Sequence, residues 1–306
     1  GKEYVVILDF IGNYNNNFMI PVALSGDRSY NADTIRKYVI SGNRTIPGAS
    51  TIHFDEVAKN KIFHSIDRIR GIKSIIRESY ISLKNRLGRT PRLYDFYSNN
   101  EVDPLVIIRE YKTYYGFLES MEKANYCCTL TEQEKLILEY LSKTILSGVR
   151  PEELEILQLL LRQNAISIET FQKLYQEKYR KNIMEDQVNC ALEVLQGKFV
   201  SNEKEYQKYE TIDMISCDQT SRITRVSKYG ELLRNVEFRS QVEDIIKVGL
   251  ARYHDKFMNT NEVVSPFVLY EKYSRRDVSL LMNCGKDLSS VMFGMKRIQE
   301  DVFIFV

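Results

Sequence analysis

At the centre of the 306-residue chain, Pro151-Glu-Glu-Leu-Glu-Ile-Leu-Gln-Leu-Leu-Leu-Arg162 has the pattern of a short helix. The proline stands at its first position, where the missing N–H costs no hydrogen bond. Two helices of similar length are predicted to follow, over residues 168–179, which Ser167 caps, and over residues 184–196, which Gly197 ends. A further helix is predicted in front, over residues 132–146.

Two short strands are predicted behind these helices, over residues 211–216 and 222–227. Three short helices followed by a hairpin is the order of a winged helix, and residues 184–196 would hold the recognition-helix position. That helix carries Glu185, Asp186 and Glu193, whereas a helix that enters a DNA groove normally presents Arg or Lys. DNA contact and protein–protein packing therefore both stay open for this unit.

The earlier part of the chain is also predicted to be helical. Residues 74–87 form an amphipathic helix that ends at Gly88, a short helix runs from Pro91 through residue 97, and an apolar stripe follows Asp103-Pro104 as far as residue 118. Three such helices suit a helix-turn-helix-like bundle, a fold that serves as a plain scaffold as well as a DNA-binding unit.

Residues 4–10 are predicted to form a strand and not a helix. This apolar, β-branched run is typical of a strand buried on both faces. Nothing downstream supplies the parallel sheet that such a strand needs, so we expect further sequence before Gly1. The fold class is therefore mainly α, with helix-turn-helix-like and winged-helix-like units, a residual strand of a preceding domain at the start and a truncated α/β module at the end. The expected domains are 1–27, 28–126, 127–258 and 259–306.

Composition limits the function. The net charge of +2 gives no global positive field, so any DNA contact must come from local basic patches. Five cysteines without C-x-x-C spacing and three histidines argue against a metal site and against a secreted disulfide framework. The Cys127-Cys128 pair is interpreted as buried packing. No apolar run approaches the roughly 18 residues of a membrane helix, and a reducing, cytoplasmic setting is expected.

The opening segment carries a family resemblance. Residues 1–17 and 18–31, and then 48–56 and 269–278, resemble segments of bacterial superfamily II DEAD/DEAH-type helicases related to type III restriction enzyme res subunits. In that family the first segment follows the last arginine-bearing motif, where the second RecA-like domain ends. The resemblance implies a C-terminal accessory region of unknown function.

The resemblance also implies that the parent protein is an ATP-dependent helicase and hydrolase. A motor needs a Gly-rich phosphate loop with a lysine and an acidic magnesium motif, and these 306 residues contain neither. ATP and Mg are therefore expected in the parent motor, with no cofactor, metal or catalytic residue in this region. His53 with Asp55 and Glu56 is the most enzyme-like cluster, but it is better interpreted as the start of a helix.

We therefore expect a non-catalytic accessory region that binds or positions duplex or forked DNA beside RecA-like domains of the same chain. The alternative is a protein–protein scaffold that links the motor to a nuclease or other partner without DNA contact. Arg275-Arg276 could bind phosphate, but a solvated face is favoured. The DNA-binding candidates are Arg86, Arg89, Arg92, Lys178, Arg180, Lys181, Arg222, Arg225 and Lys228.

Overall fold

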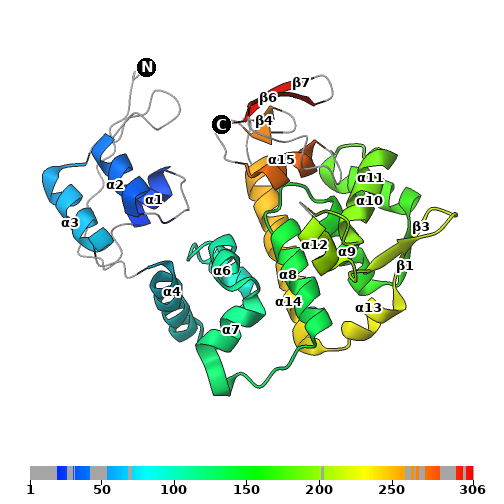
Figure 1. The fold of residues 1–306 in the computed structure, drawn as a ribbon, viewed down its shortest axis with the longest axis horizontal. Helices are drawn as coiled ribbons and strands as arrows, with labels where there is room; N and C mark the ends of the chain where they lie inside the picture. Colours follow the sequence, from blue (N-terminus) through cyan, green and yellow to red (C-terminus); the bar gives the residue numbers. More distant parts are fainter. Residues whose placement is uncertain are drawn as a thin grey trace. The chain divides into compact units, whose positions relative to one another are not determined.

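The computed structural model describes residues 19–25, 30, 32–41, 54–67, 71–200, 203–258, 263–264, 267–268, 273–282, 294–298 and 301–305. These residues are mainly helical, as predicted (Figure 1). The chain divides into two compact units, residues 1–90 with 101–106 and residues 91–100 with 107–306. The boundaries expected after residues 126 and 258 both fall inside the second unit.

The described helices of the first unit are α1 (Met19–Ser25), α2 (Ala32–Ser41), α3 (Glu56–Asp67) and α4 (Ile72–Leu87). Asp55 begins α3 as expected, because its Oδ1 accepts a hydrogen bond from the Ala58 N–H at 2.6 Å. Gly88 ends α4 in the left-handed conformation, with φ of 66°. The predicted strand at residues 4–10 and His53 lie outside the described residues.

The second unit holds most of the helices. They are α5 (Leu93–Ser98), α7 (Tyr114–Glu122), α8 (Glu132–Thr144), α9 (Glu152–Arg162), α10 (Ile168–Tyr179), α11 (Glu185–Leu195), α12 (Glu203–Tyr209), α13 (Ser227–Leu232), α14 (Val236–Tyr253) and α15 (Arg275–Leu281). Helix α6 (Pro104–Tyr111) spans the division between the units. A single helix was predicted from residue 104 to 118, and this prediction is wrong. The chain breaks at Lys112, which has φ of 67°, and the Thr113 side chain then caps α7.

A small antiparallel sheet lies within the second unit. Its strands are β1 (Ala165–Ser167), β2 (Ile215–Cys217) and β3 (Arg222–Arg225), and their order is β1-β3-β2. Ser167 is opposite Arg222, and Ile215 is opposite Arg225. Two hairpins follow along the chain, β4 (Val263–Val264) with β5 (Phe267–Val268) and β6 (Gly294–Ile298) with β7 (Asp301–Phe305). Strand β1 was not predicted, because three residues are too few to show a period.

Helix α14 forms the centre of the second unit. It packs against α5, α8 and α9, and Figure 1 shows α8 and α14 side by side. Its inward residues are mostly apolar, and Phe238, Val242 and Val248 are completely buried. The chain after α8 comes close to α14 at Gly148 and Gly249, where neither residue carries a side chain. Helices α5, α8 and α9 therefore share α14 as their common packing partner.

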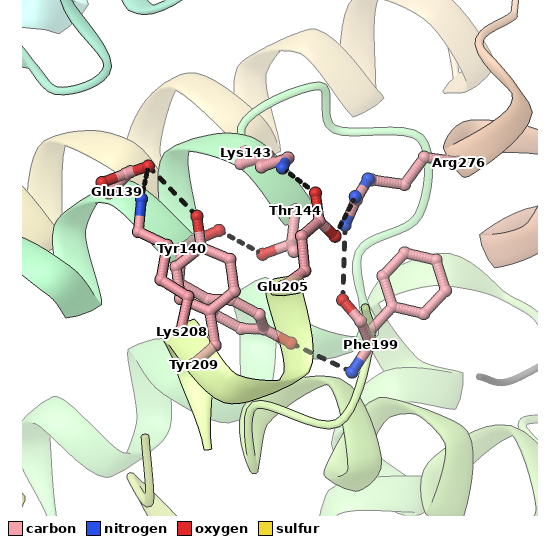
Figure 2. Close-up of polar contacts among 9 residues, drawn as sticks. All are labelled: Glu139, Tyr140, Lys143, Thr144, Phe199, Glu205, Lys208, Tyr209 and Arg276. Carbon is pink, nitrogen blue, oxygen red and sulfur yellow. Dashed lines mark hydrogen bonds and ion pairs between the residues drawn. The ribbon is translucent and has the colours of Figure 1, made fainter. Parts of the chain in front are cut away.

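Helix α12 was not predicted. Ion pairs connect it to α8 and to α15 (Figure 2). On α8, Glu139 pairs with Lys208 and Lys143 pairs with Glu205. On α15, the Arg276 guanidinium lies 3.1 Å from the other oxygen of Glu205. Arg276 also packs over the Phe199 ring, 5.3 Å from its centroid. The expectation of a solvated face is therefore wrong for Arg276, whose side chain is mostly buried.

Candidate nucleic-acid interface

Helices α9, α10 and α11 of the second unit lie where three short helices were predicted, and α12 comes between α11 and the hairpin of β2 and β3. The Ser167 hydroxyl begins α10, because it accepts a hydrogen bond from the Thr170 N–H at 3.1 Å. Arg180 ends the same helix in the left-handed conformation, with φ of 56°. Strand β1 precedes α10, and its pairing with β3 places the hairpin beside the start of that helix.

Helix α11, at the recognition-helix position, turns its apolar face inward and its acidic face outward. Val188, Ala191 and Leu195 are completely buried. A hollow of about 470 Å³ lies between α11 and Cys217 of β2, and Asp186 and Glu193 line it with no basic side chain among its lining residues. The outward face therefore repels phosphate instead of attracting it.

The first three predicted DNA-binding residues, Arg86, Arg89 and Arg92, already make contacts within the protein. The Arg86 guanidinium lies 3.0 Å from Glu101, and Arg89 donates to a neighbouring backbone carbonyl at 3.0 Å. Arg92 donates to the Ser240 hydroxyl on α14. All three side chains reach the surface, but Arg86 has its charge partly balanced and Arg92 helps to hold α5 on α14.

The second basic set divides into one paired lysine and two unpaired residues. Lys178 Nζ lies 2.5 Å from Glu155 Oε1 and 5.5 Å from the centre of the Tyr179 ring. The exposed side chains of Arg180 and Lys181 make no hydrogen bond or ion pair within the described residues. Within this set, Arg180 and Lys181 in the loop after α10 therefore keep their donors for an external anion.

The third set divides in the same way. Arg225 donates to a carbonyl of the last turn of α9 at 2.8 Å and to the Asn164 side chain, so it holds the end of that helix. The side chains of Arg222 and Lys228 are exposed and make no hydrogen bond or ion pair in the described part of the chain, although the Arg222 backbone N–H donates to Asp218 Oδ1 at 3.0 Å. Arg222 lies near Asp218, whose pKa is lowered chiefly by the Thr220 hydroxyl.

Two further arginines near the hairpin were missed by the sequence analysis. Arg234 and Arg239 lie on either side of Asn235, the N-cap of α14, and both line a hollow that Arg225 also lines. Arg239 donates to the Leu161 carbonyl at 3.2 Å and pairs with Glu243 at 3.0 Å. Their positions on either side of Asn235 were visible in the sequence, but nothing there placed them beside Arg225.

A buried group of charges lies between α9 and its neighbours. The Arg150 Nε donates to both carboxylate oxygens of Glu153, at 2.8 and 3.1 Å, and Nη1 donates to the Leu280 carbonyl at 3.0 Å. Glu152 accepts a hydrogen bond from the Tyr175 hydroxyl at 3.2 Å, while its second oxygen is buried without a partner. Burial raises the pKa of Glu152, although Arg150 opposes the shift.

The members of this group, Arg150, Glu152 and Glu153, are all buried, so their charges interact inside the protein. Within the described residues, no three His, Cys, Asp or Glu side chains are placed to hold a metal ion. Cys127 and Cys128 are exposed, so the interpretation of the pair as buried packing is wrong. Of the four cysteines that the structure describes, Cys190 is buried. None of the helices described here is long and apolar enough to cross a membrane.

Comparison with known proteins adds a family but no activity. Residues 76–255, more than half of the chain, match the family described as "Domain of unknown function (DUF8090)". The curated proteins give no match. All nine predicted DNA-binding residues, as well as Arg234 and Arg239, lie within the matched range.

Proposed function

The chain belongs to the DUF8090 family of domains of unknown function, and we propose that it is a non-catalytic accessory region of an ATP-dependent superfamily II DNA helicase. In this proposal the region binds or positions duplex or forked DNA beside the motor. The resemblance of the opening residues to the end of a RecA-like domain supports the helicase context. The order of helices and strands in the second unit, together with its exposed basic side chains, supports the contact with DNA.

The observation that carries the proposal is the arrangement of α9, β1, α10, α11, β2 and β3, with α12 between α11 and β2. Their order along the chain and the sheet order β1-β3-β2 support a winged-helix interpretation. In helix-turn-helix folds the neighbouring helix and loops hold the DNA backbone while one helix approaches the groove. Because fold alone does not imply function, we infer the mode of DNA binding from the positions of the charged residues.

The residues proposed to contact DNA are four of the nine predicted basic residues, whose side chains make no hydrogen bond or ion pair inside the described protein. Arg180 and Lys181 follow α10, Arg222 begins β3, and Lys228 lies on α13. Lys178 and Arg225 are proposed to have structural roles, because Glu155 and the end of α9 already hold them. Four exposed cations of this kind suit the phosphate backbone of DNA.

The acidic outer face of α11 sets the expected mode of binding. Asp186 and Glu193 would be repelled by phosphates on both sides of a groove, so α11 is not proposed to read bases. Contacts made to phosphates alone carry no sequence information. The region should therefore bind DNA with little sequence preference and with a steep dependence on salt.

The same acidic face favours a second candidate function, which is a protein–protein scaffold without DNA contact. A basic surface on the motor, or on a nuclease partner, would complement Asp186 and Glu193. In either case ATP and Mg belong to the motor, and this region supplies no catalytic group. A cytoplasmic setting is part of the proposal, and the free state of all four described cysteines supports it.

Fluorescence anisotropy with single-stranded, duplex and forked DNA, at low and moderate salt, tests the proposal. The variants R180E/K181E and R222E/K228E should each weaken binding, and each should reduce the slope of log affinity against log salt by about two. The matched control is R77E/K204E, which makes the same change in charge at two other exposed positions.

The outcomes separate the two candidates. Equal loss of binding in all three double variants would mean that only net charge matters, and the assigned surface would be wrong. Absence of binding by the unaltered protein at low salt would support the scaffold. In that case D186K/E193K should abolish the binding of a basic protein partner while R222E/K228E should not.

A further inference from the structure

A hollow of about 880 Å³ lies at the base of the hairpin, between the end of α9, strand β3, helix α13 and the start of α14. Three arginines line it, and only one acidic residue does. The charged and polar residues in its lining that matter here are Arg225, Arg234, Arg239, Asn164, Ser227 and Glu231.

Two of the arginines are fixed in place by the protein. Arg225 Nη1 donates to the Leu160 carbonyl at 2.8 Å, and Arg239 Nη2 donates to the Leu161 carbonyl at 3.2 Å. Both therefore cap the negative C-terminal end of α9. A guanidinium has five N–H donors, and the described contacts use two in Arg225 and two in Arg239. Each arginine therefore keeps unused N–H donors on a side chain that is already held in place. Binding a ligand would cost little further side-chain entropy.

Arg234 differs from the other two because nothing in the described protein holds it. Its side chain is exposed, lines the hollow, and makes no hydrogen bond or ion pair with any described residue. It can therefore close on a ligand that the two fixed arginines have already engaged. A guanidinium group binds an anion with two or more oxygens through pairs of N–H donors.

The surroundings leave the hollow positive. Glu231 is the one carboxylate in its lining, and Glu243 pairs with Arg239 at 3.0 Å. Val236, which lines the hollow, is the first residue of the 18-residue helix α14, so the positive end of that helix is near. Tyr229 has a fully buried hydroxyl without a partner, and Arg225 and Arg239 both act on it electrostatically.

We propose that this hollow binds a phosphate group carried by a nucleotide or by a nucleic-acid strand. Planar guanidinium groups match the oxygens of phosphate in pairs, and a hollow of 300 to 1,000 Å³ is about the size that holds a small organic ligand. The inference goes beyond the proposed function, because a mononucleotide would satisfy the site without any contact between the chain and duplex DNA.

Isothermal titration of the whole chain with AMP, with adenosine and with single-stranded dT12 tests the proposal. AMP or dT12 should bind at low salt, whereas adenosine, which lacks phosphate, should not. Arg234→Gln should weaken this binding by about tenfold or more, because it removes one charged pair. Arg77→Gln, an exposed arginine of α4, is the matched control and should leave binding unchanged.

The two sources of phosphate are distinguished by which ligand responds. Loss of AMP binding in Arg234→Gln assigns a nucleotide site, and loss of dT12 binding alone assigns a strand contact. Arg239→Lys is the second variant, because it keeps the charge and removes the planar group, and it should also weaken binding. The proposal is overturned if neither ligand binds, if adenosine binds as well as AMP, or if Arg234→Gln and Arg77→Gln behave alike. The proposed DNA contact at Arg180, Lys181, Arg222 and Lys228 is judged separately, by its own variants.

Discussion

The Asp244 carboxylate of α14 accepts a hydrogen bond from the backbone N–H of Leu93, 2.9 Å away and 151 positions earlier in the chain. Leu93 is the first residue of α5, so a carboxylate from a distant helix satisfies a free N–H of this short helix. Asp244 is only 5% exposed, and burial raises its pKa to about 6, although Arg92 and the hydrogen bonds oppose the shift.

Asp244→Asn should remove a pH dependence of stability. The folded pKa of about 6 lies above the ordinary 3.8, so the stabilisation from this group is complete below pH 3.8 and is lost as pH rises through 6. Relative to Asp244→Asn, the unaltered protein should lose about 1 to 3 kcal/mol of unfolding free energy between pH 4 and pH 7. Urea unfolding at both pH values measures the difference. Parallel pH profiles would show that Asp244 does not hold its proton in the folded state.

Arg150→Met should be among the most destabilising substitutions in the second unit. Arg150 and Glu153 are 7% and 1% exposed, and removing the guanidinium leaves a buried carboxylate without compensation, at a cost of about 3 to 5 kcal/mol. The double variant R150M/E153L should recover part of this loss, because the carboxylate that pairs with Arg150 is removed with it, while Glu152 stays buried. Lys173→Met breaks an exposed pair with Glu169 and should change the urea midpoint little. Equal effects of the two single variants would contradict the argument.

Tyr140→Phe should cost more than Tyr209→Phe, although the two rings lie 5.1 Å apart (Figure 2). The buried Tyr140 hydroxyl donates to the Val194 carbonyl at 2.6 Å and accepts from the Phe199 N–H at 3.3 Å. Its removal leaves that N–H buried without a partner, which costs about 1 to 3 kcal/mol. The Tyr209 hydroxyl bonds to Glu139, which Lys208 still satisfies after the substitution. Thermal unfolding of both variants compares them, and a larger effect at Tyr209 would be unexpected on these grounds.

The helices were predictable where local signals are strong. Ser167 and the end of the apolar period predicted α10 at residues 168–179, which are the observed bounds. The break between α6 and α7 was not predictable, because Lys112 adopts a left-handed conformation that lysine rarely favours. Helix α12 was missed because its contacts to α8 and α15, which hold it, connect residues about 60 to 70 positions apart.

The candidate site was only partly predictable, for the same physical reason. Sequence identified basic residues, but whether each is available depends on partners that the fold brings together. Lys178 meets Glu155, and Arg225 meets the end of α9, and neither pairing has a local signal. The arginine-lined hollow draws on residues 164–239, so no window of sequence contains it.

Gly148→Ala should be far more damaging than Gly88→Ala, although both glycines have nearly the same backbone conformation. Their φ values are +62° and +66°, so alanine would be strained by about 1 kcal/mol at either position. At Gly148 the added Cβ would also lie 2.2 Å from the Gly249 carbonyl oxygen, whereas at Gly88 nothing lies within 4 Å. Backbone cannot yield as a flexible side chain can, so α14 must move away from α8 and lose part of its packing.

We therefore expect Gly148→Ala to lose at least about 3 kcal/mol of unfolding free energy, against about 1 kcal/mol for Gly88→Ala. Urea unfolding gives the total loss, and hydrogen exchange assigns it, to α8 and α14 in the first case and to the end of α4 in the second. Equal losses would mean that backbone strain alone sets the cost. The close approach at Gly249 would then contribute little to the packing of α14.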